Sequence, residues 1–246
     1  MIRVDRGPEP AELQTVREDG LAKARSALAA GEAPDLTGYQ PYRRPLRLAQ
    51  RSKCAWCERW AEERFEDVEH YRPRHLYWWL TWTWSNLLFS CSECNRSWKR
   101  SQFPLARGQR LVAEQDPPGK ERPLLLDPSI DDPCAHIQFR LIDERWVPLP
   151  RDGSRRGHAT IEALGLNRDT LHDLYSAHVR SLSDGIETIR DALTRRDGAE
   201  ISRRWTVVLE SRLRANAPFA ALTRDVLDHH FPKVQRERWG LTLPSL

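Results

Sequence analysis

Two Cys-x-x-Cys pairs constrain this chain more than any other feature. The first pair is Cys54 with Cys57, and the second is Cys91 with Cys94. Each pair forms a turn that aims two thiolates at one point, and four thiolates make the tetrahedral sulfur site that Zn²⁺ prefers. Two redox dithiols are the weaker alternative, because neither pair follows a strand–helix–strand pattern. The spacing therefore predicts a structural zinc ion held by four cysteines.

The stretch between the two pairs is wider than in a short zinc ribbon, so something functional can be inserted there. Residues 64–70 read Arg-Phe-Glu-Asp-Val-Glu-His, which predicts a short strand that ends in Glu69 and His70 and is terminated by Pro73. Neighbouring strand residues point to opposite sides, so Glu69 and His70 are expected to do different jobs. Asn95 directly follows Cys94 and is expected to begin a helix over residues 95–100.

These polar residues predict a second, catalytic metal site. A carboxylate and an amide oxygen suit Mg²⁺ or Mn²⁺, so Glu69 and Asn95 are the candidate ligands. His70 is then free to act as general base for water that attacks a phosphodiester. Taken singly, Glu69 and His70 are explained by a surface ion pair and Asn95 by a helix cap. Their order inside a four-cysteine frame favours catalysis, whereas a zinc deaminase is excluded because the chain has no His-x-Glu at His70.

In this order the chain resembles the HNH endonuclease family, in which a zinc knuckle encloses a ββα-metal site. The residues that carry the resemblance are Cys54, Cys57, Glu69, His70, Asn86, Cys91, Cys94, Asn95 and Lys99. The resemblance implies that Glu69 and Asn95 bind the metal and that His70 is the base. It also implies that Asn86 completes the catalytic set by bracing a loop through backbone hydrogen bonds, and that Lys99 meets a phosphate.

The chain is similar, more narrowly, to the HNH proteins of Septu and retron-associated anti-phage systems. The further matching segments are Phe103-Pro, Leu126-Asp-Pro, Asp132-Pro with His136, and residues 159–168. This resemblance implies a companion ATPase of the ABC/SMC-like kind and, in a retron setting, a reverse transcriptase with a non-coding RNA. The chain itself has no P-loop, so any ATP dependence must come from a partner.

The charge pattern suits a nucleic-acid substrate. The formal net charge is +4 and the pI is about 8.9. Basic residues precede the first cysteine pair, and others follow His70 and Asn95, as a phosphate track requires. An ordinary solvated charged face is the alternative. The residues near the site that are expected to bind nucleic acid are Arg72, Arg74, Arg96, Lys99 and Arg100, and those before the first pair are Arg43, Arg44, Arg47, Arg51 and Lys53.

The expected fold is α+β, with a zinc-stapled ββα-metal core and surrounding helices that are mainly C-terminal. We divide the chain into a helical and connector segment (1–50), the nuclease core (51–110), a turn-rich segment with a hairpin near residues 138–148 (111–150) and a helical region (151–246). Apolar stripes predict helices over residues 8–31, 159–164, 200–215 and 218–230, and one long helix that Asn167 caps and that reaches Leu193. The aromatic run at residues 77–84 is expected to be core rather than a base-stacking surface.

Composition bounds the setting. The 246 residues carry no apolar run of membrane-spanning length and no recognisable signal peptide. Five cysteines, four of them assigned to zinc, favour a reducing cytoplasm, and Cys134 is left over as a small apolar residue.

The predicted function is metal-dependent cleavage of DNA by the effector of an anti-phage system that a partner ATPase controls. Two alternatives stay open. The first is an HNH nuclease that cleaves RNA or transfer RNA. The second is a zinc-stabilised nucleic-acid-binding or adaptor module without catalysis.

Overall fold

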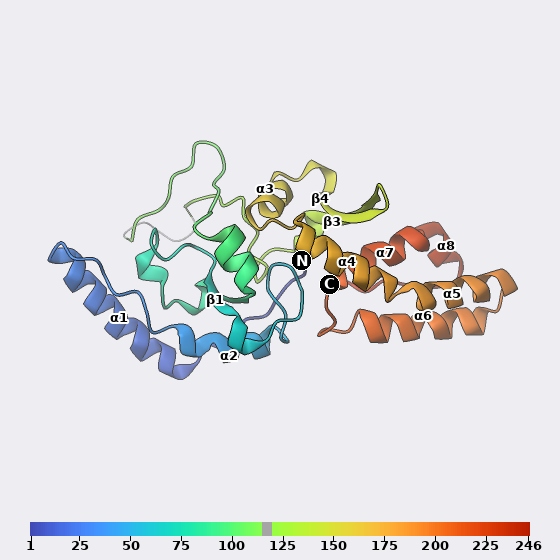
Figure 1. Ribbon diagram of the computed structural model, residues 1–246, viewed down its shortest axis with the longest axis horizontal. Coiled ribbons are helices and arrows are strands. Elements are labelled where there is room, and N and C mark those ends of the chain that lie inside the picture. The colour runs from blue at the N-terminus through green and yellow to red at the C-terminus, as the bar shows by residue number, and fades with distance from the viewer. Residues whose placement is uncertain (115–119) are drawn as a thin grey trace.

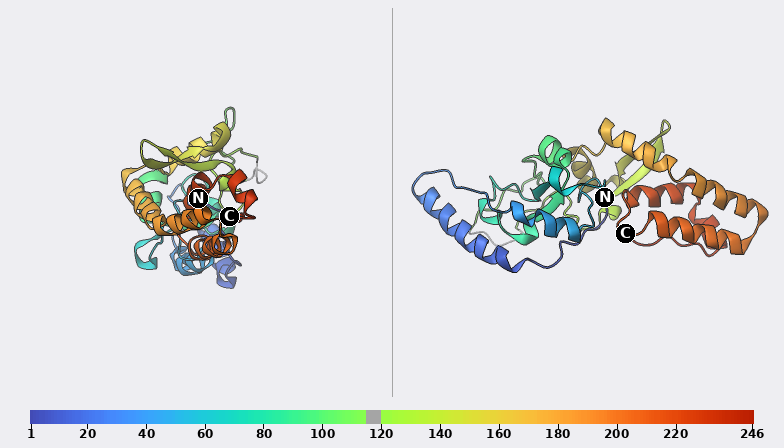
Figure 2. Two further views of the ribbon diagram at one scale, coloured as in Figure 1. Left: turned by 90° about the vertical axis from the view of Figure 1, so that its right-hand side faces the viewer. Right: turned by 60° about the horizontal axis from the view of Figure 1, so that its bottom comes forward.

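The computed structural model describes residues 1–114 and 120–246. The protein is elongated, with helix α1 (Ala11–Ala29) at one end and the pair α5 (Ser183–Arg195) and α6 (Gly198–Arg212) at the other (Figures 1 and 2). Helices and two-stranded sheets make up its regular structure, which confirms a mixed helix-and-sheet protein. Within residues 1–114 and 120–246, no helix combines the length and the apolar composition that a membrane span requires.

Between these ends the described chain forms four strands and several further helices. The strands are β1 (Asp67–His70), β2 (Leu87–Ser90), β3 (Ile137–Ile142) and β4 (Arg145–Pro150). The other helices are α2 (Arg43–Ala49), the π-helix η5 (Glu93–Lys99), α3 (Arg155–Ala163), α4 (Asp169–Arg180), α7 (Ala220–His230) and α8 (Lys233–Arg238).

The first sheet carries the residues that the sequence singles out. Strand β1 pairs antiparallel with β2, with His70 opposite Leu87. It begins three residues later than residue 64 because residues 63–65 form a 3-10 turn, η2 (Glu63–Phe65). Helix η5 follows β2 and begins at Glu93, earlier than the expected start at Asn95. The order strand, strand, helix therefore brings Glu69, His70 and Asn95 onto adjoining elements.

A side chain from α2 completes the hydrogen bonding of β2. Gln50 caps the C-terminal end of α2 and is 3% exposed. Its Nε2 donates to the carbonyl of Phe89 at 2.8 Å, and its Oε1 accepts the N–H of Phe89 at 2.8 Å. The amide therefore satisfies backbone groups that point away from the β1 partner, as a further strand would.

The second sheet is the expected hairpin. Ile142 pairs with Arg145, so the loop contains only Asp143 and Glu144. Both loop residues have positive φ, 46° and 63°, as a type I′ turn requires. This turn matches the right-handed twist of the flanking strands. Strand β3 extends back to Ile137.

The long helix expected from Asn167 to Leu193 is divided into α4 and α5. Ser181 and Leu182 separate the two, and the Ser181 hydroxyl donates to the carbonyl of His178. The next residues are Ser183, Asp184 and Gly185. Serine and aspartate favour caps over helix interiors and glycine has low helix propensity, so a break here outweighs the apolar stripe. Arg168, not Asn167, holds the N-cap position of α4.

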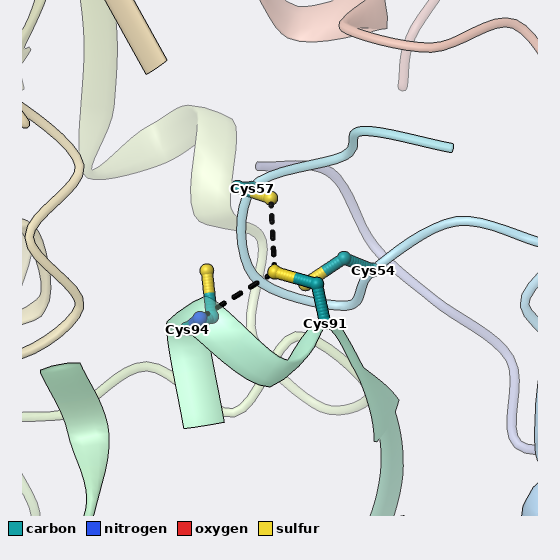
Figure 3. A group of neighbouring side chains, drawn as sticks. All are labelled: Cys54, Cys57, Cys91 and Cys94. Atoms are coloured by element: carbon teal, nitrogen blue, oxygen red, sulfur yellow. Dashed lines mark hydrogen bonds between the residues drawn. The ribbon is translucent and has the colours of Figure 1, made fainter. Parts of the chain in front are cut away.

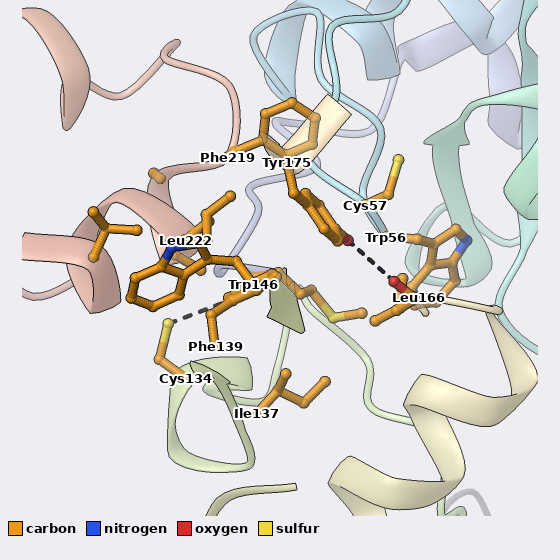
Figure 4. Packing of buried hydrophobic residues seen from close by; sticks show 14 of the residues in the cluster. Trp56, Cys57, Cys134, Ile137, Phe139, Trp146, Leu166, Tyr175, Phe219 and Leu222 are labelled. Atoms are coloured by element: carbon orange, nitrogen blue, oxygen red, sulfur yellow. Dashed lines mark hydrogen bonds between the residues drawn. The ribbon is translucent and has the colours of Figure 1, made fainter. Parts of the chain in front are cut away.

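The buried residues form two clusters. The larger one joins the cysteine region to the C-terminal helices, and Figure 4 shows Trp56 and Cys57 in the same packing as Tyr175 and Phe219. The smaller cluster joins α1 and α2 to the first sheet. Most of the aromatic run at residues 77–84 lies in these clusters, as expected: Tyr77, Trp82 and Trp84 are buried, and Trp78 and Trp79 are half-buried.

Gly165 fixes η5 against the helical region. It ends α3 with a φ of +53°, as predicted for a helix closed by glycine. A Cβ at this position would lie 2.0 Å from the ring of Trp98 in η5. Only glycine therefore permits both the turn and the close approach of Trp98.

We expect Gln50→Ala to lower the free energy of unfolding by about 2 kcal/mol, because it leaves a buried N–H without a partner. The melting temperature should fall by about 4–8 °C. The matched control is Gln14→Ala on the exposed face of α1, which should change the free energy of unfolding by less than about 0.5 kcal/mol. Equal melting temperatures for the two variants would contradict the role assigned to Gln50.

Candidate metal centre and cleft

The four predicted cysteines converge on one point. Their sulfur atoms all lie within 4.8 Å of one another, and all four residues are buried (Figure 3). Zinc–sulfur bonds of about 2.3 Å in a tetrahedron set neighbouring sulfurs about 3.8 Å apart. The Sγ atoms of Cys57 and Cys91 lie 3.8 Å apart, and none of the cysteines is in a disulfide. These residues can therefore hold a tetrahedral ion such as Zn²⁺.

Positively charged and N–H groups around the four cysteines offset the negative charge of their thiolates. The backbone N–H of Cys94 donates to the sulfur of Cys91 at 3.4 Å, and Arg168 donates to the sulfur of Cys94 at 3.4 Å. Burial alone would lower the pKa of Arg168, but the sulfurs of Cys94 and Cys57 outweigh burial and raise it. Four thiolates around Zn²⁺ carry a net charge of about −2. The guanidinium of Arg168 offsets part of that charge.

A cleft of about 420 Å³ lies beside β1 and η5. Three of the predicted catalytic residues, Glu69, His70 and Asn95, line it. The other lining residues are Leu36, Tyr39, Val68, Pro73, Arg74, His75, Arg100 and Ser101. The structure therefore brings the predicted base and both predicted ligands to one hollow.

His70 is held in one orientation. Its Nε2 lies 2.9 Å from the carbonyl of Thr81, which can only accept, so Nε2 carries the hydrogen and Nδ1 keeps its lone pair. The ring of Tyr39 meets the imidazole edge-on with centroids 4.6 Å apart. Burial lowers the pKa of His70 to about 4, and Arg74 and Lys99 act in the same direction. The imidazole is therefore neutral at pH 7.

Glu69 points to the other side of β1, toward η5. Its Oε1 lies 2.6 Å from the ammonium of Lys99, and the two side chains are 3% and 0% exposed. Lys99 also donates to the carbonyl of His70 at 2.8 Å. Burial raises the pKa of Glu69, although the nearby Lys99 ammonium opposes this. Lys99 thus braces β1 from within, and the expected contact with a phosphate does not fit its full burial.

Asn95 is oriented by a carboxylate that the sequence argument missed. The Nδ2 of Asn95 donates to Asp67 at 3.1 Å, and Arg96 binds the same carboxylate at 2.5 and 2.8 Å. With Nδ2 fixed in this way, no described group donates to Asn95 Oδ1. Asp67 precedes Glu69 by two residues, so the strand period places both carboxylates on one face. That period could have identified Asp67 from the sequence.

Asn86 makes the bracing contacts that the resemblance implies. Its Oδ1 accepts the N–H of Arg72 at 2.8 Å, and its Nδ2 donates to the carbonyls of Arg72 and Leu80 at 3.1 and 3.2 Å. Asn86 is 2% exposed and does not line the cleft. Its place is therefore beneath the loop that follows His70.

The five basic residues expected near nucleic acid have different environments. Arg74 and Arg100 are exposed and line the cleft. Arg72 is bound to the buried carboxylate of Glu121 at 2.6 Å, and the exposed Arg96 is bound to Asp67. Only Arg74 and Arg100 of this set therefore present their charge at the cleft.

Tyr39 lines the cleft, and the sequence did not identify it. It belongs to the connector before η1 (Gln40–Tyr42), and nothing in its local pattern indicates a site. Arg74 donates to the carbonyl of Leu36 at 2.9 Å, which fixes the connector against the cleft. Such a long-range contact has no signal in one sequence.

The fold and the cluster define a mixed helix-and-sheet protein with a buried four-cysteine site suited to a tetrahedral ion. No protein-family model matches the chain. It is 25% identical over 232 residues to the Septu protein PtuB of Bacillus mycoides (strain KBAB4), across 82% of this chain and 78% of that protein. A Septu protein PtuB of Bacillus thuringiensis is 27% identical over 164 residues, across 66% of this chain and 54% of that protein.

A further match is to a protein with a different Septu name. The Septu protein PtuA of Bacillus mycoides (strain KBAB4) is 29% identical over 136 residues, across 50% of this chain but only 18% of that protein. The chain thus spans about half of one of these relatives and less than a fifth of another. Together the matches confirm the predicted similarity to the Septu systems, and specifically to PtuB.

We expect the purified protein to contain one zinc ion per chain and Cys91→Ser to lose it, because three thiolates and a hydroxyl make a poorer site. The Cys91→Ser protein should also melt at a lower temperature, since metal binding contributes to folding. Cys134→Ala, which removes the cysteine outside the cluster, is the control and should keep its zinc. Elemental analysis checks the metal content, and full zinc in Cys91→Ser would contradict the assignment.

We expect Lys99→Met to lower the free energy of unfolding by about 3–5 kcal/mol, because it leaves Glu69 buried without its counter-charge. Arg100→Met removes one positive charge from an exposed neighbour and should cost less than about 0.5 kcal/mol. Urea unfolding of both variants measures the difference. If Lys99 were only a phosphate contact, the two variants would be equally stable.

Proposed function

We propose that this chain is a metal-dependent HNH-type endonuclease. The observation that carries the proposal is the cleft in which a neutral His70 with a fixed tautomer lies beside Glu69 and Asn95. The cleft combines a base, two side chains whose oxygens can bind a metal ion, and exposed arginines. This combination suits the hydrolysis of a phosphodiester. The succession of β1, β2 and η5 next to a four-cysteine site supports the ββα-metal arrangement.

His70 is the general base in this proposal. The carbonyl of Thr81 binds Nε2–H, so Nδ1 is the atom that accepts a proton from the attacking water. The edge-on ring of Tyr39 restricts rotation of the imidazole. Both contacts keep the lone pair in place before any substrate binds.

Glu69 and Asn95 fit a hard divalent cation such as Mg²⁺ or Mn²⁺. Asn95 Oδ1 has no described donor, and the carboxylate of Glu69 lies in the same cleft, so both supply the oxygen that such ions prefer. Asp67 would fix the Asn95 amide through Nδ2. When bound there, the ion would stabilise negative charge on the phosphate and on the leaving oxygen.

The other residues hold this arrangement or attract the substrate. Arg74 and Arg100 would bind phosphates on either side of the bond that is cut. Asn86 would keep the loop after His70 closed, and Lys99 would hold β1 against η5. A structural Zn²⁺ on the four cysteines would fix the start of η5 relative to β2.

The similarity to the Septu protein PtuB supports a role in anti-phage defence. In this setting we propose a partner of the Septu type that is an ABC/SMC-like ATPase and that restrains or directs the nuclease. A retron-associated reverse transcriptase with its RNA is a further partner to test. DNA is the proposed substrate, and RNA or transfer RNA is the second candidate because the proposed contacts of Arg74 and Arg100 are to phosphates, which DNA and RNA share.

We expect the protein to nick supercoiled plasmid in Mg²⁺ or Mn²⁺, and His70→Ala to reduce the rate by about 10²–10⁴-fold, since it removes the general base. His75→Ala, which changes an exposed histidine of the same cleft, is the matched control and should cut at nearly the normal rate. Labelled single-stranded DNA, RNA and transfer RNA in parallel reactions separate the candidate substrates.

A His70→Ala protein that cuts like the parent would refute the proposed base. If neither the chain alone nor its complex with the ATPase cuts DNA or RNA, the non-catalytic adaptor would be the better description. In that case substitutions of Glu69, His70 and Asn95 would leave function intact, whereas those of the four cysteines would not.

A further inference from the structure

A second hollow lies beside the first cysteine pair. It has a volume of about 650 Å³ and is formed by the end of α2, the segment after Cys57, η2 and the connection between α6 and α7. We call it the Trp60 groove, and its principal residues are Arg47, Arg51, Arg59, Trp60, Phe65 and Asn216. None of these residues lines the cleft of His70. The basic run before the first cysteine pair therefore supplies a separate surface.

Two aromatic rings in the groove are open to solvent. Trp60 is 57% exposed and Phe65 is 58% exposed. The indole N–H of Trp60 donates to the carbonyl of Asn216 at 2.9 Å, so the polar end of the ring is already satisfied and the ring is held in place. The guanidinium of Arg64 lies 4.4 Å from the centroid of Phe65. The groove thus presents two rings that are more than half exposed: Trp60, which is anchored by its N–H, and Phe65, which has one face covered by Arg64.

The charge that is free in the groove is positive. The carboxylate of Glu66 is occupied on both oxygens, by Arg59 and by the N–H of Ser92, each at 2.6 Å. Glu62 faces Arg64 at 3.6 Å. In the described ranges neither Arg47 nor Arg51 forms an ion pair with a carboxylate, and the Nε of Arg47 donates to the carbonyl of Ala61 at 3.5 Å. A ligand with negative charge would therefore meet two available guanidinium groups.

We propose that the Trp60 groove binds single-stranded nucleic acid, with bases stacked on Trp60 and Phe65 and phosphates on Arg47 and Arg51. Flat aromatic faces beside free arginines are the combination that such proteins use, and stacking requires bases that are not paired. The inference rests on the proposed function for the identity of the substrate. Extended chain joins Glu66, at the groove, to His70 in the cleft over about 13 Å, so one strand of a few nucleotides can reach both.

The test measures binding without cleavage. All proteins carry His70→Ala and are titrated, without added divalent metal, against a fluorescein-labelled single-stranded DNA of 20 nucleotides. We expect Trp60→Ala to weaken binding about 10-fold, the loss typical of one stacked base. Arg47→Ala with Arg51→Ala should reduce the slope of log K against log salt concentration by about 1.4, since each phosphate contact on a single strand contributes about 0.7.

The control is Arg180→Ala with Arg195→Ala, which removes two exposed positive charges from α4 and α5 and should leave affinity and slope unchanged. Zinc content and melting temperature show that each variant is folded, and Trp60→Phe, which keeps a stacking ring, should recover most of the affinity. Parent-like affinity and slope in both groove variants would overturn the proposal. Every protein in this test carries His70→Ala, so the measured binding does not depend on cleavage. Failure of the nuclease assay would therefore leave the binding result valid.

Discussion

The convergence of four cysteine sulfurs is the constraint on which the rest of the structure depends. Cys91 directly follows β2 and Cys94 lies within η5, so an ion at this point fixes the strand and the helix relative to each other. Arg168 extends the constraint to the C-terminal helices through its bond to Cys94. The cleft is built from β1, which pairs with β2, and from η5. Its geometry therefore depends on a cluster whose own residues do not line it.

The local parts of the fold could be predicted because their signals are local. The cysteine spacing, the Asp143–Glu144 turn and the glycine after α3 each specify their own geometry. The break between α4 and α5 was missed because the apolar stripe continues through it. Burial of a charged residue was also missed: Lys99 and Arg100 are neighbours in the sequence, yet one is 0% exposed and the other lies at the surface. Only the partner of each side chain decides this, and Glu69 is far away in the chain.

The candidate site also contains residues that the sequence identifies and residues that it does not. Glu69, His70 and Asn95 were expected together, and all three line one cleft. They lie on two short elements: β1, which is between the two cysteine pairs, and η5, which contains Cys94. Their chemical roles are still predictions. The two-residue period of β1 could have identified Asp67 from the sequence. Tyr39 has no such signal, because hydrogen bonds from Arg74 and Trp82 hold its connector against the cleft. Contacts of that kind depend on how α1 packs, which no spacing rule specifies.

The contacts between β1 and η5 form a ladder in which Asp67 meets Asn95 and Arg96, and Glu69 meets Lys99. The N–H of Arg100 bonds to the carbonyl of Asn95, so the helix turn between these rungs holds one residue more than an α-helix would. The π-turn thus places Lys99 opposite Glu69, and a codon inserted between Asn95 and Lys99 would move that ammonium along the helix and leave the buried carboxylate without its partner. In evolutionary terms, selection on this segment acts on its length as well as on the side chains of Asn95 and Lys99.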